Sequence, residues 1–181
     1  NFRLMTEGGG VYVSIEDATA RNVRIDMGLA SFDAWSMDIR CEEAELVGKE
    51  MSFEGRLYPV TCVSVGNPHC AIMMNKVNPG HARFLGPILE NHELFPHRMN
   101  AVFIELIDEK ALRIEIWERG AGYTMASETS ACAAAAAARR LGLVGDVVTV
   151  NMPGGAIDIR FDGDRVLMTG TVEPLFYGHF S

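Results

Sequence analysis

Residues 127–142 have the sequence SETSACAAAAAARRLG and predict a helix packed closely against other elements. A hydroxyl oxygen can cap a helix by accepting a free backbone N–H, and the first turn offers three of them (Ser127, Thr129 and Ser130). Two arginines follow where the helix dipole favours cations, and Gly142 supplies a C-terminal stop. The small side chains of Ala131–Ala138 let such a helix approach a sheet closely, and they imply no cofactor.

Outside this helix, segments with alternating apolar and polar residues predict strands. The expected strands are a hairpin around Gly8–Gly10, residues 23–27 ended by Gly28, and residues 57–65, 101–106, 112–117, 147–150, 157–161 and 166–169. Residues 31–48 have no clean period and are expected to be a loop or an irregular edge of the sheet. A second helix is expected from Pro79 to about Asn91, kinked or split by Pro87. Many antiparallel strands with two helices predict an α+β fold without an internal boundary.

The composition is that of a folded globular protein. The chain has 181 residues, of which 48% are hydrophobic and 22% are charged. A net charge of -8 and the lack of a basic stripe argue against a nucleic-acid partner. The longest apolar run, Ala131–Ala138, is too short to cross a membrane.

The first residue and the cysteines indicate how the polypeptide is processed and in which compartment the protein is expected. The chain begins with Asn1 and carries no signal segment, so it is expected to be part of a longer or processed product. The four cysteines share no CxxC spacing, which disfavours a zinc site (Cys41, Cys62, Cys70 and Cys132). Reduced, buried thiols in a cytoplasmic protein are expected, with the thiol of Cys132 in the core.

Gly66-Asn67-Pro68-His69 follows a predicted strand directly. Such a turn ends the strand and places polar side chains at its end, where binding groups are common. A plain turn with a surface histidine is the competing interpretation.

A second polar turn, Glu118-Arg119-Gly120-Ala121-Gly122, connects a predicted strand to the start of the alanine-rich helix. Glycines before a helix start expose backbone N–H groups, and this arrangement binds carboxylates or phosphates. The competing interpretation is a pair of neighbouring charges on a solvated turn.

An ordered set of motifs resembles the diaminopimelate epimerases over nearly the whole chain. The matching segments are Val63–Cys70, Leu85–Glu90, Glu118–Gly122, Ser130–Ala134, Met152–Gly155 and Met168–Gly170. Each motif alone is weakly specific, whereas the collinear set is highly specific.

The resemblance implies a fold of two similar lobes with the active site in the cleft between them. Residues 1–181 would form the C-terminal lobe, a mostly antiparallel sheet wrapped around a central helix. The last strand, at about 171–181, would return toward a first lobe. That lobe is expected in the same polypeptide or in a separate chain, and a homodimer or heterodimer is a further expectation.

The resemblance also implies an amino-acid racemase or epimerase that uses no pyridoxal phosphate and no metal, as in lysine biosynthesis. In such enzymes one cysteine removes the α-proton of a small amino-acid substrate and another returns a proton from the opposite side. Matching positions imply catalytic roles for Ser127, His69 and Glu118. They imply substrate binding by Asn67, Asn100, Arg119, Glu128 and Thr129.

The chain departs from the family pattern at the start of the helix. Ser127 stands where the family has its second catalytic cysteine, and an alcohol is a much poorer base than a thiol. Glu128 replaces a glycine and would repel a substrate carboxylate unless it pairs with Arg119 or the substrate is cationic. Tyr123 replaces a glutamate.

Three interpretations remain open from the sequence. The first is a diverged isomerase in which Ser127 donates a proton or Glu128 is a new base. The second is a non-catalytic or half-catalytic partner in a heteromeric enzyme. The third is a binding or scaffold protein. The retained polar residues favour a working amino-acid pocket over a pure scaffold.

Overall fold

The computed structural model describes residues 1–6 and 9–179 and contains two helices and twelve strands within them. The helices are α1 (Pro79–Glu90) and α2 (Glu128–Arg140). The strands are β1 (Phe2–Thr6), β2 (Gly9–Ile15), β3 (Asn22–Leu29), β4 (Lys49–Phe53), β5 (Arg56–Ser64), β6 (Pro68–Met74), β7 (Asn100–Asp108), β8 (Ala111–Glu118), β9 (Gly122–Thr124), β10 (Val147–Met152), β11 (Gly155–Asp162) and β12 (Arg165–Thr171).

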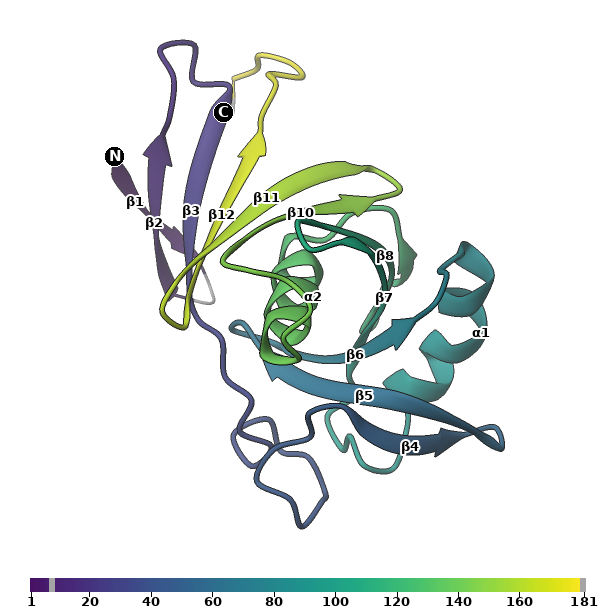
Figure 1. Ribbon diagram of the computed structural model, residues 1–181. Coiled ribbons are helices and arrows are strands. Elements are labelled where there is room, and N and C mark those ends of the chain that lie inside the picture. Colours follow the sequence, from purple (N-terminus) through teal and green to yellow (C-terminus); the bar gives the residue numbers. More distant parts are fainter. Residues whose placement is uncertain (7–8, 180–181) are drawn as a thin grey trace.

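All the strands belong to one mixed sheet, in the order β1-β2-β3-β12-β11-β10-β8-β7-β6-β5-β4, with β9 paired to β8. The pairs β6/β7 and β8/β10 are parallel and the other pairs are antiparallel. The part from β5 to β12 curls around α2, whereas β1, β2 and β3 project away from it beside β12 (Figure 1). The α+β class is therefore confirmed, with a sheet that is mixed.

Helix α2 occupies the inside of the curled sheet as the alanine run predicts. It contacts strands β5, β6, β7, β8, β10, β11 and β12, and all residues from Ser130 to Ala138 are buried. Ser127 caps the helix, and its Oγ accepts the Ser130 N–H at 3.4 Å. The chain leaves the helix through Gly142, whose φ of +74° favours glycine.

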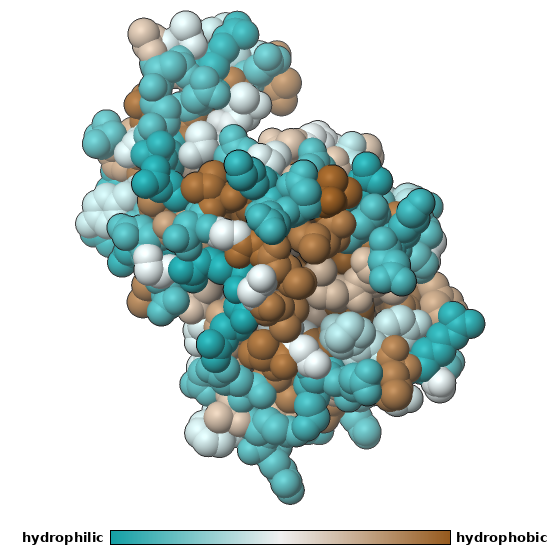
Figure 2. All heavy atoms as spheres, in the orientation of Figure 1, coloured by the Kyte–Doolittle hydropathy of each residue, from teal (hydrophilic) through white to brown (hydrophobic). Residues whose placement is uncertain are grey.

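Helix α1 covers the outer face of the same sheet and forms a second apolar core with the irregular segment 30–48. Ala82, Leu85 and Leu89 of α1 pack there against buried side chains of β6 and β7. In the orientation of Figure 1, hydrophobic residues gather in a band across the middle of the molecule, below the projecting strands (Figure 2). The candidate site lies on the inner face, at the start of α2.

Several local expectations need correction. Pro87 does not split α1, because it lies in the last turn, where few helical bonds follow it. Strand β3 continues through Gly28, whose φ is +84°, to Leu29. Of the expected hairpin turn, Gly8 lies outside the described residues, and Gly9 and Gly10 belong to β2.

The C-terminal segment departs from its expected conformation. Only Thr171 of the strand expected at about 171–181 belongs to a strand, which is β12. Residues 172–179 have no regular secondary structure, and residues 180–181 lie outside the described part. Three large apolar side chains of this segment are exposed (Leu175, Phe176 and Tyr177).

Two further expectations concern the thiols, which were expected to be reduced and buried, and the helices, which were expected not to cross a membrane. All four cysteines are free; Cys41 is partly buried, and the other three are buried. Burial, assisted by the charge of Glu128, raises the pKa of the Cys132 thiol to about 12, so this thiol is an inert part of the core. Neither helix of the described residues is long and apolar enough to span a membrane.

Candidate active site

Three predicted site residues lie in one row across neighbouring strands. His69 of β6 pairs in register with Asn100 of β7, and Glu118 ends β8 next to the pair formed by Ala101 and Trp117. Side chains alternate along a strand, and the residues two positions away pack in the core around α2 (Ala71, Val102 and Ile116). His69, Asn100 and Glu118 therefore share the face of the sheet that carries α2.

His69 is fully buried, so the alternative of a surface histidine is wrong. Its Nδ1–H donates to the Asn67 carbonyl oxygen at 3.0 Å, which leaves Nε2 as the unprotonated ring nitrogen. Nε2 is buried and has no hydrogen-bond partner within the described residues. Burial is the main cause that lowers the pKa of His69 to about 4; the charge of Arg119 lowers it further, against the Asn67 carbonyl. The imidazole is therefore neutral at pH 7 and available as an acceptor.

The low pKa of His69 makes the stability of this chain depend on pH. The unfolded chain binds a proton at this side chain below pH 6.5, whereas the folded chain does so only near pH 4. The free energy of unfolding should therefore fall as the pH drops below 6.5, by about 2 kcal/mol between pH 7 and pH 5. Urea unfolding at both pH values, compared with His69→Gln, isolates this contribution. An equal pH dependence in wild type and variant would contradict it.

The two asparagines of the site connect its loops. The Asn67 amide donates to the Thr129 hydroxyl in the first turn of α2 at 3.5 Å. The Asn100 amide donates to the Pro68 carbonyl at 2.9 Å, and its oxygen accepts the Arg119 backbone N–H at 3.0 Å. Both ends of the Asn100 amide are thus engaged with main chain, which joins the two polar turns to each other.

The charged side chains of the site are not paired with one another. The Arg119 guanidinium donates to the His97 carbonyl at 3.0 Å. Among the ion pairs of the described residues, none includes Glu118, Arg119 or Glu128. The pair between Glu128 and Arg119 that would neutralise the new carboxylate does not form, and Glu128 is exposed to solvent.

The start of α2 gathers polar atoms that lack protein partners. Ser127 is buried, and its N–H approaches the Met152 sulfur at 3.5 Å. Buried atoms without partners in the described residues include Asn67 Oδ1, His69 Nε2 and Ser130 Oγ. Because buried polar atoms are rarely left unpaired in native proteins, this group is a candidate ligand site. Asn67 thus contacts the first turn of α2, which carries Ser127, Glu128 and Thr129. His69 bonds to Asn67, Asn100 joins the two polar turns, and the Arg119 guanidinium is directed toward His97.

Sequence reasoning assigned no role to Glu90, the last residue of α1. Its carboxylate is buried and bonds to Arg98, Trp117 and the Gly120 backbone, directly behind the Glu118–Arg119 turn. Helical spacing could have predicted that Glu90 is buried, because Glu90 falls on the same face of α1 as the buried Gly86.

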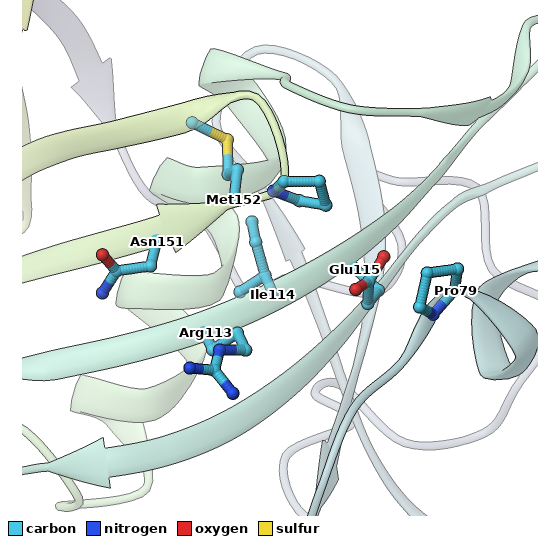
Figure 3. Close-up of a pocket in the computed structure, with 7 residues that line it drawn as sticks. Pro79, Arg113, Ile114, Glu115, Asn151 and Met152 are labelled. Carbon is cyan, nitrogen blue, oxygen red and sulfur yellow. The ribbon is translucent and has the colours of Figure 1, made fainter.

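A pocket of about 240 Å³ lies between residues of β8 and β10 (Figure 3). It is distinct from the candidate site at the start of α2. It is lined by Pro79, Arg113, Ile114, Glu115, Asn151, Met152 and Pro153, none of which is a predicted site residue. Its polar groups are already engaged: Glu115 accepts the Tyr123 hydroxyl at 2.8 Å, and Asn151 donates to the Leu112 carbonyl at 3.0 Å.

Solved structures with a similar fold include a hydroxyproline epimerase from Agrobacterium vitis with bound trans-4-hydroxy-L-proline. It has a TM-score of 0.67 and 15% sequence identity, covering 93% of this chain and 55% of that one. A probable proline racemase from Agrobacterium radiobacter has a TM-score of 0.60 and 12% identity, covering 93% and 56%. At these identities the likeness concerns the fold alone.

Sequence comparisons are more specific. The family model of diaminopimelate epimerase matches residues 61–175. Diaminopimelate epimerase 2 of Nostoc sp. is 40% identical over 99% of this chain and 63% of its own length. The diaminopimelate epimerase of Pelotomaculum thermopropionicum is 35% identical over 92% of this chain and 60% of its own length. The chain thus spans about three fifths of these relatives, and it belongs to the diaminopimelate epimerase family.

Proposed function

We propose that this chain is the C-terminal lobe of a cofactor-independent amino-acid racemase or epimerase that acts together with a first lobe. The observation that carries the proposal is the set of unpartnered buried atoms at the start of α2. Asn67 Oδ1 and His69 Nε2 both lack a donor, which an α-ammonium group supplies. The free N–H groups and positive dipole end of α2 suit a carboxylate. An α-amino acid carries both groups on one carbon.

The reaction would remove the α-proton from one face of the substrate and return a proton to the other face. An α-proton is very weakly acidic, so the protein must position proton-transfer groups and stabilise the developing charge on the carboxylate. Here the start of α2 would hold the carboxylate, with Thr129 and Asn67 beside it. His69 and Glu118 would assist proton transfer from the sheet. Arg119 would contact the substrate's polar groups through the guanidinium N–H groups that His97 does not engage, and Asn100, whose amide is engaged with main chain, would hold the two polar turns in place.

The proton-transfer group proposed on this lobe is a serine, where the family has a cysteine. Ser127 occupies the cap position from which a side chain can face the substrate, yet an alcohol stays protonated near neutral pH. Ser127 would therefore act as a proton donor rather than as a strong base. Glu128, one residue further and exposed, is the alternative base on the same turn of α2.

A second candidate function is that of an amino-acid-binding or non-catalytic partner lobe in a heteromeric assembly. The observation that favours it is the engagement of Ser127 as a helix cap: its Oγ already accepts the Ser130 N–H. In this role the polar pocket would bind the amino acid, and a different lobe would supply the chemistry.

The chain alone is expected to show no exchange of the α-proton of diaminopimelate in deuterated water. One lobe supplies half of the cleft and cannot exclude water from the reacting carbon. Joining the chain to the first lobe of the Nostoc relative should restore exchange, measured by the loss of the α-proton NMR signal. The same fusion carrying His69→Gln is the matched control and should exchange more slowly.

Each departure from this result has a distinct meaning. Exchange by the isolated chain would refute the two-lobe arrangement. A fusion that binds diaminopimelate in calorimetry but exchanges no proton would favour the binding role. A fusion that neither binds nor exchanges would refute the amino-acid pocket for this substrate, and histidine and glutamate would be tested in the same way.

A further inference from the structure

The carboxylate of Glu90 makes three hydrogen bonds in a buried position. Oε1 accepts the Arg98 guanidinium N–H at 3.1 Å and the Gly120 backbone N–H at 2.8 Å. Oε2 accepts the Trp117 indole N–H at 2.7 Å. The Glu90 side chain is 8% exposed, whereas that of Arg98 is 54% exposed, so a half-solvated cation compensates a buried anion.

Two of these donors lie on either side of Glu118 and Arg119, the two residues of this turn that have a role in the proposed function. Trp117 comes just before Glu118 and Arg119, and Gly120 comes just after them. The turn is tight, because the Ala121 N–H donates to the Glu118 carbonyl at 3.1 Å and Gly120 has a φ of +80°. From the outer face of the sheet, the Glu90 carboxylate therefore forms hydrogen bonds with the residues on both sides of the turn, Trp117 and Gly120.

The helix that carries Glu90 is itself tightly fixed to the same tryptophan. A Cβ added at Gly86 would lie 2.4 Å from Cγ of Trp117, so the helix backbone packs directly on the indole ring. Glu90, one helical turn further, then reaches the indole N–H. Helix α1, Trp117 and the turn are thus joined by direct contacts.

Stability alone is a poor account of this arrangement. A buried carboxylate is costly to desolvate, and an apolar side chain of similar volume often stabilises a fold as well or better. What the carboxylate adds is orientation, because three donors from two segments, one at Arg98 and one at residues 117–120, converge on its two oxygen atoms.

We infer that Glu90 is a positioning residue, which fixes the main chain of the turn that carries Glu118 and Arg119. The effect of Glu90 on activity rests on the proposed function, whereas its hydrogen bonds to the turn are a property of the chain itself. Asn100 complements it from the inner face by accepting the Arg119 N–H.

Hydrogen exchange of the isotope-labelled 181-residue chain tests directly whether Glu90 holds the turn through its hydrogen bonds. Glu90→Gln keeps the shape of the side chain, but its amide NH2 must face either the indole or the Gly120 N–H, and two donors repel. Exchange of the Gly120 amide and the Trp117 indole proton should rise on the order of tenfold.

Glu105→Gln is the matched control. Glu105 lies on β7, holds the Val77 backbone N–H at 3.0 Å and lies 3.9 Å from Arg113, and its side chain is 12% exposed. It is therefore a similarly buried carboxylate with a backbone donor and an arginine, placed away from the turn. Exchange at Gly120 that rises in both variants, or in neither, would overturn the inference.

The consequence for the site is measured on the two-lobe fusion. Glu90→Gln should lower kcat/KM by about tenfold, with a rise in KM, while Glu105→Gln stays within about twofold of wild type. Unchanged kinetics in a Glu90→Gln variant with accelerated exchange would overturn the positioning role. If the unmutated fusion is inactive, the proposed function fails, and the exchange experiment still decides whether Glu90 holds the turn.

Discussion

Replacing Ser127 by cysteine should increase the rate of α-proton exchange by the two-lobe fusion by about a hundredfold. A thiol exchanges protons near neutral pH, and a helix N-terminus lowers its pKa further, whereas an alcohol remains protonated. The measurement is the loss of the diaminopimelate α-proton signal in deuterated water at pH 7 to 8. Cysteine also weakens the cap that Ser127 provides to Ser130, so a loss of roughly 1 kcal/mol in stability should accompany the gain.

Ser127→Ala is the matched control, because it loses the same cap and gains no thiol. Exchange in the cysteine variant that does not exceed exchange in the alanine variant would contradict the prediction. Glu128→Gly then separates the two candidate bases. If Glu128 is the base, its removal abolishes turnover and Ser127→Cys changes little. If neither variant exchanges protons although substrate still binds, the binding role is favoured.

Gly86→Ala should lower the free energy of unfolding by about 2–3 kcal/mol. An alanine normally favours a helix over glycine by roughly 1 kcal/mol, but the added Cβ would lie 2.4 to 2.6 Å from three atoms of Trp117. The helix or the ring must shift, and Trp117 is held by its hydrogen bond to Glu90. Urea unfolding followed by tryptophan fluorescence measures the loss.

Gly80→Ala provides the comparison within the same helix. Its added Cβ would approach only Oδ1 of Asn78, the end of a flexible side chain, at 2.9 Å. The expected change is within about 1 kcal/mol of zero. Equal destabilisation by the two substitutions would show that the contact with Trp117 is not the cause.

The predictable parts of the fold are those with strong local signals. Capping hydroxyls, the alanine run and Gly142 predict α2, because each acts within one or two helical turns, and of the three candidate caps the structure uses Ser127. The strands that sequence reasoning missed are short or begin at a turn (β4, β6 and β9). The parallel pairs were also missed, because they depend on the packing of α1 and α2 across the sheet and not on alternation along a strand.

The same limit applies to the site. The motifs predict that Asn67, His69 and Glu118 belong to one site. In the structure Asn67 contacts the first turn of α2, and His69 lies beside Asn100 in the sheet. The burial of His69 could not be predicted, because Gly-Asn-Pro resembles a surface turn until β7 pairs with β6 and covers it. The role of Glu90 could not be predicted for the same reason: its partners, Arg98 and residues 117–120, are brought together with it only in the folded chain.

The pairing of β3 with β12 joins residues near one end of the sequence to residues near the other. Asn22 pairs with Thr171 and Leu29 with Arg165, and β12 also packs on α2. During synthesis, β3 leaves the ribosome before β12 and must wait for this neighbour until all the elements between them have been made. Non-local pairings of this kind fold slowly, and the apolar surface around α2 stays uncovered in the meantime. The nascent chain is therefore exposed to aggregation until β12 has been made.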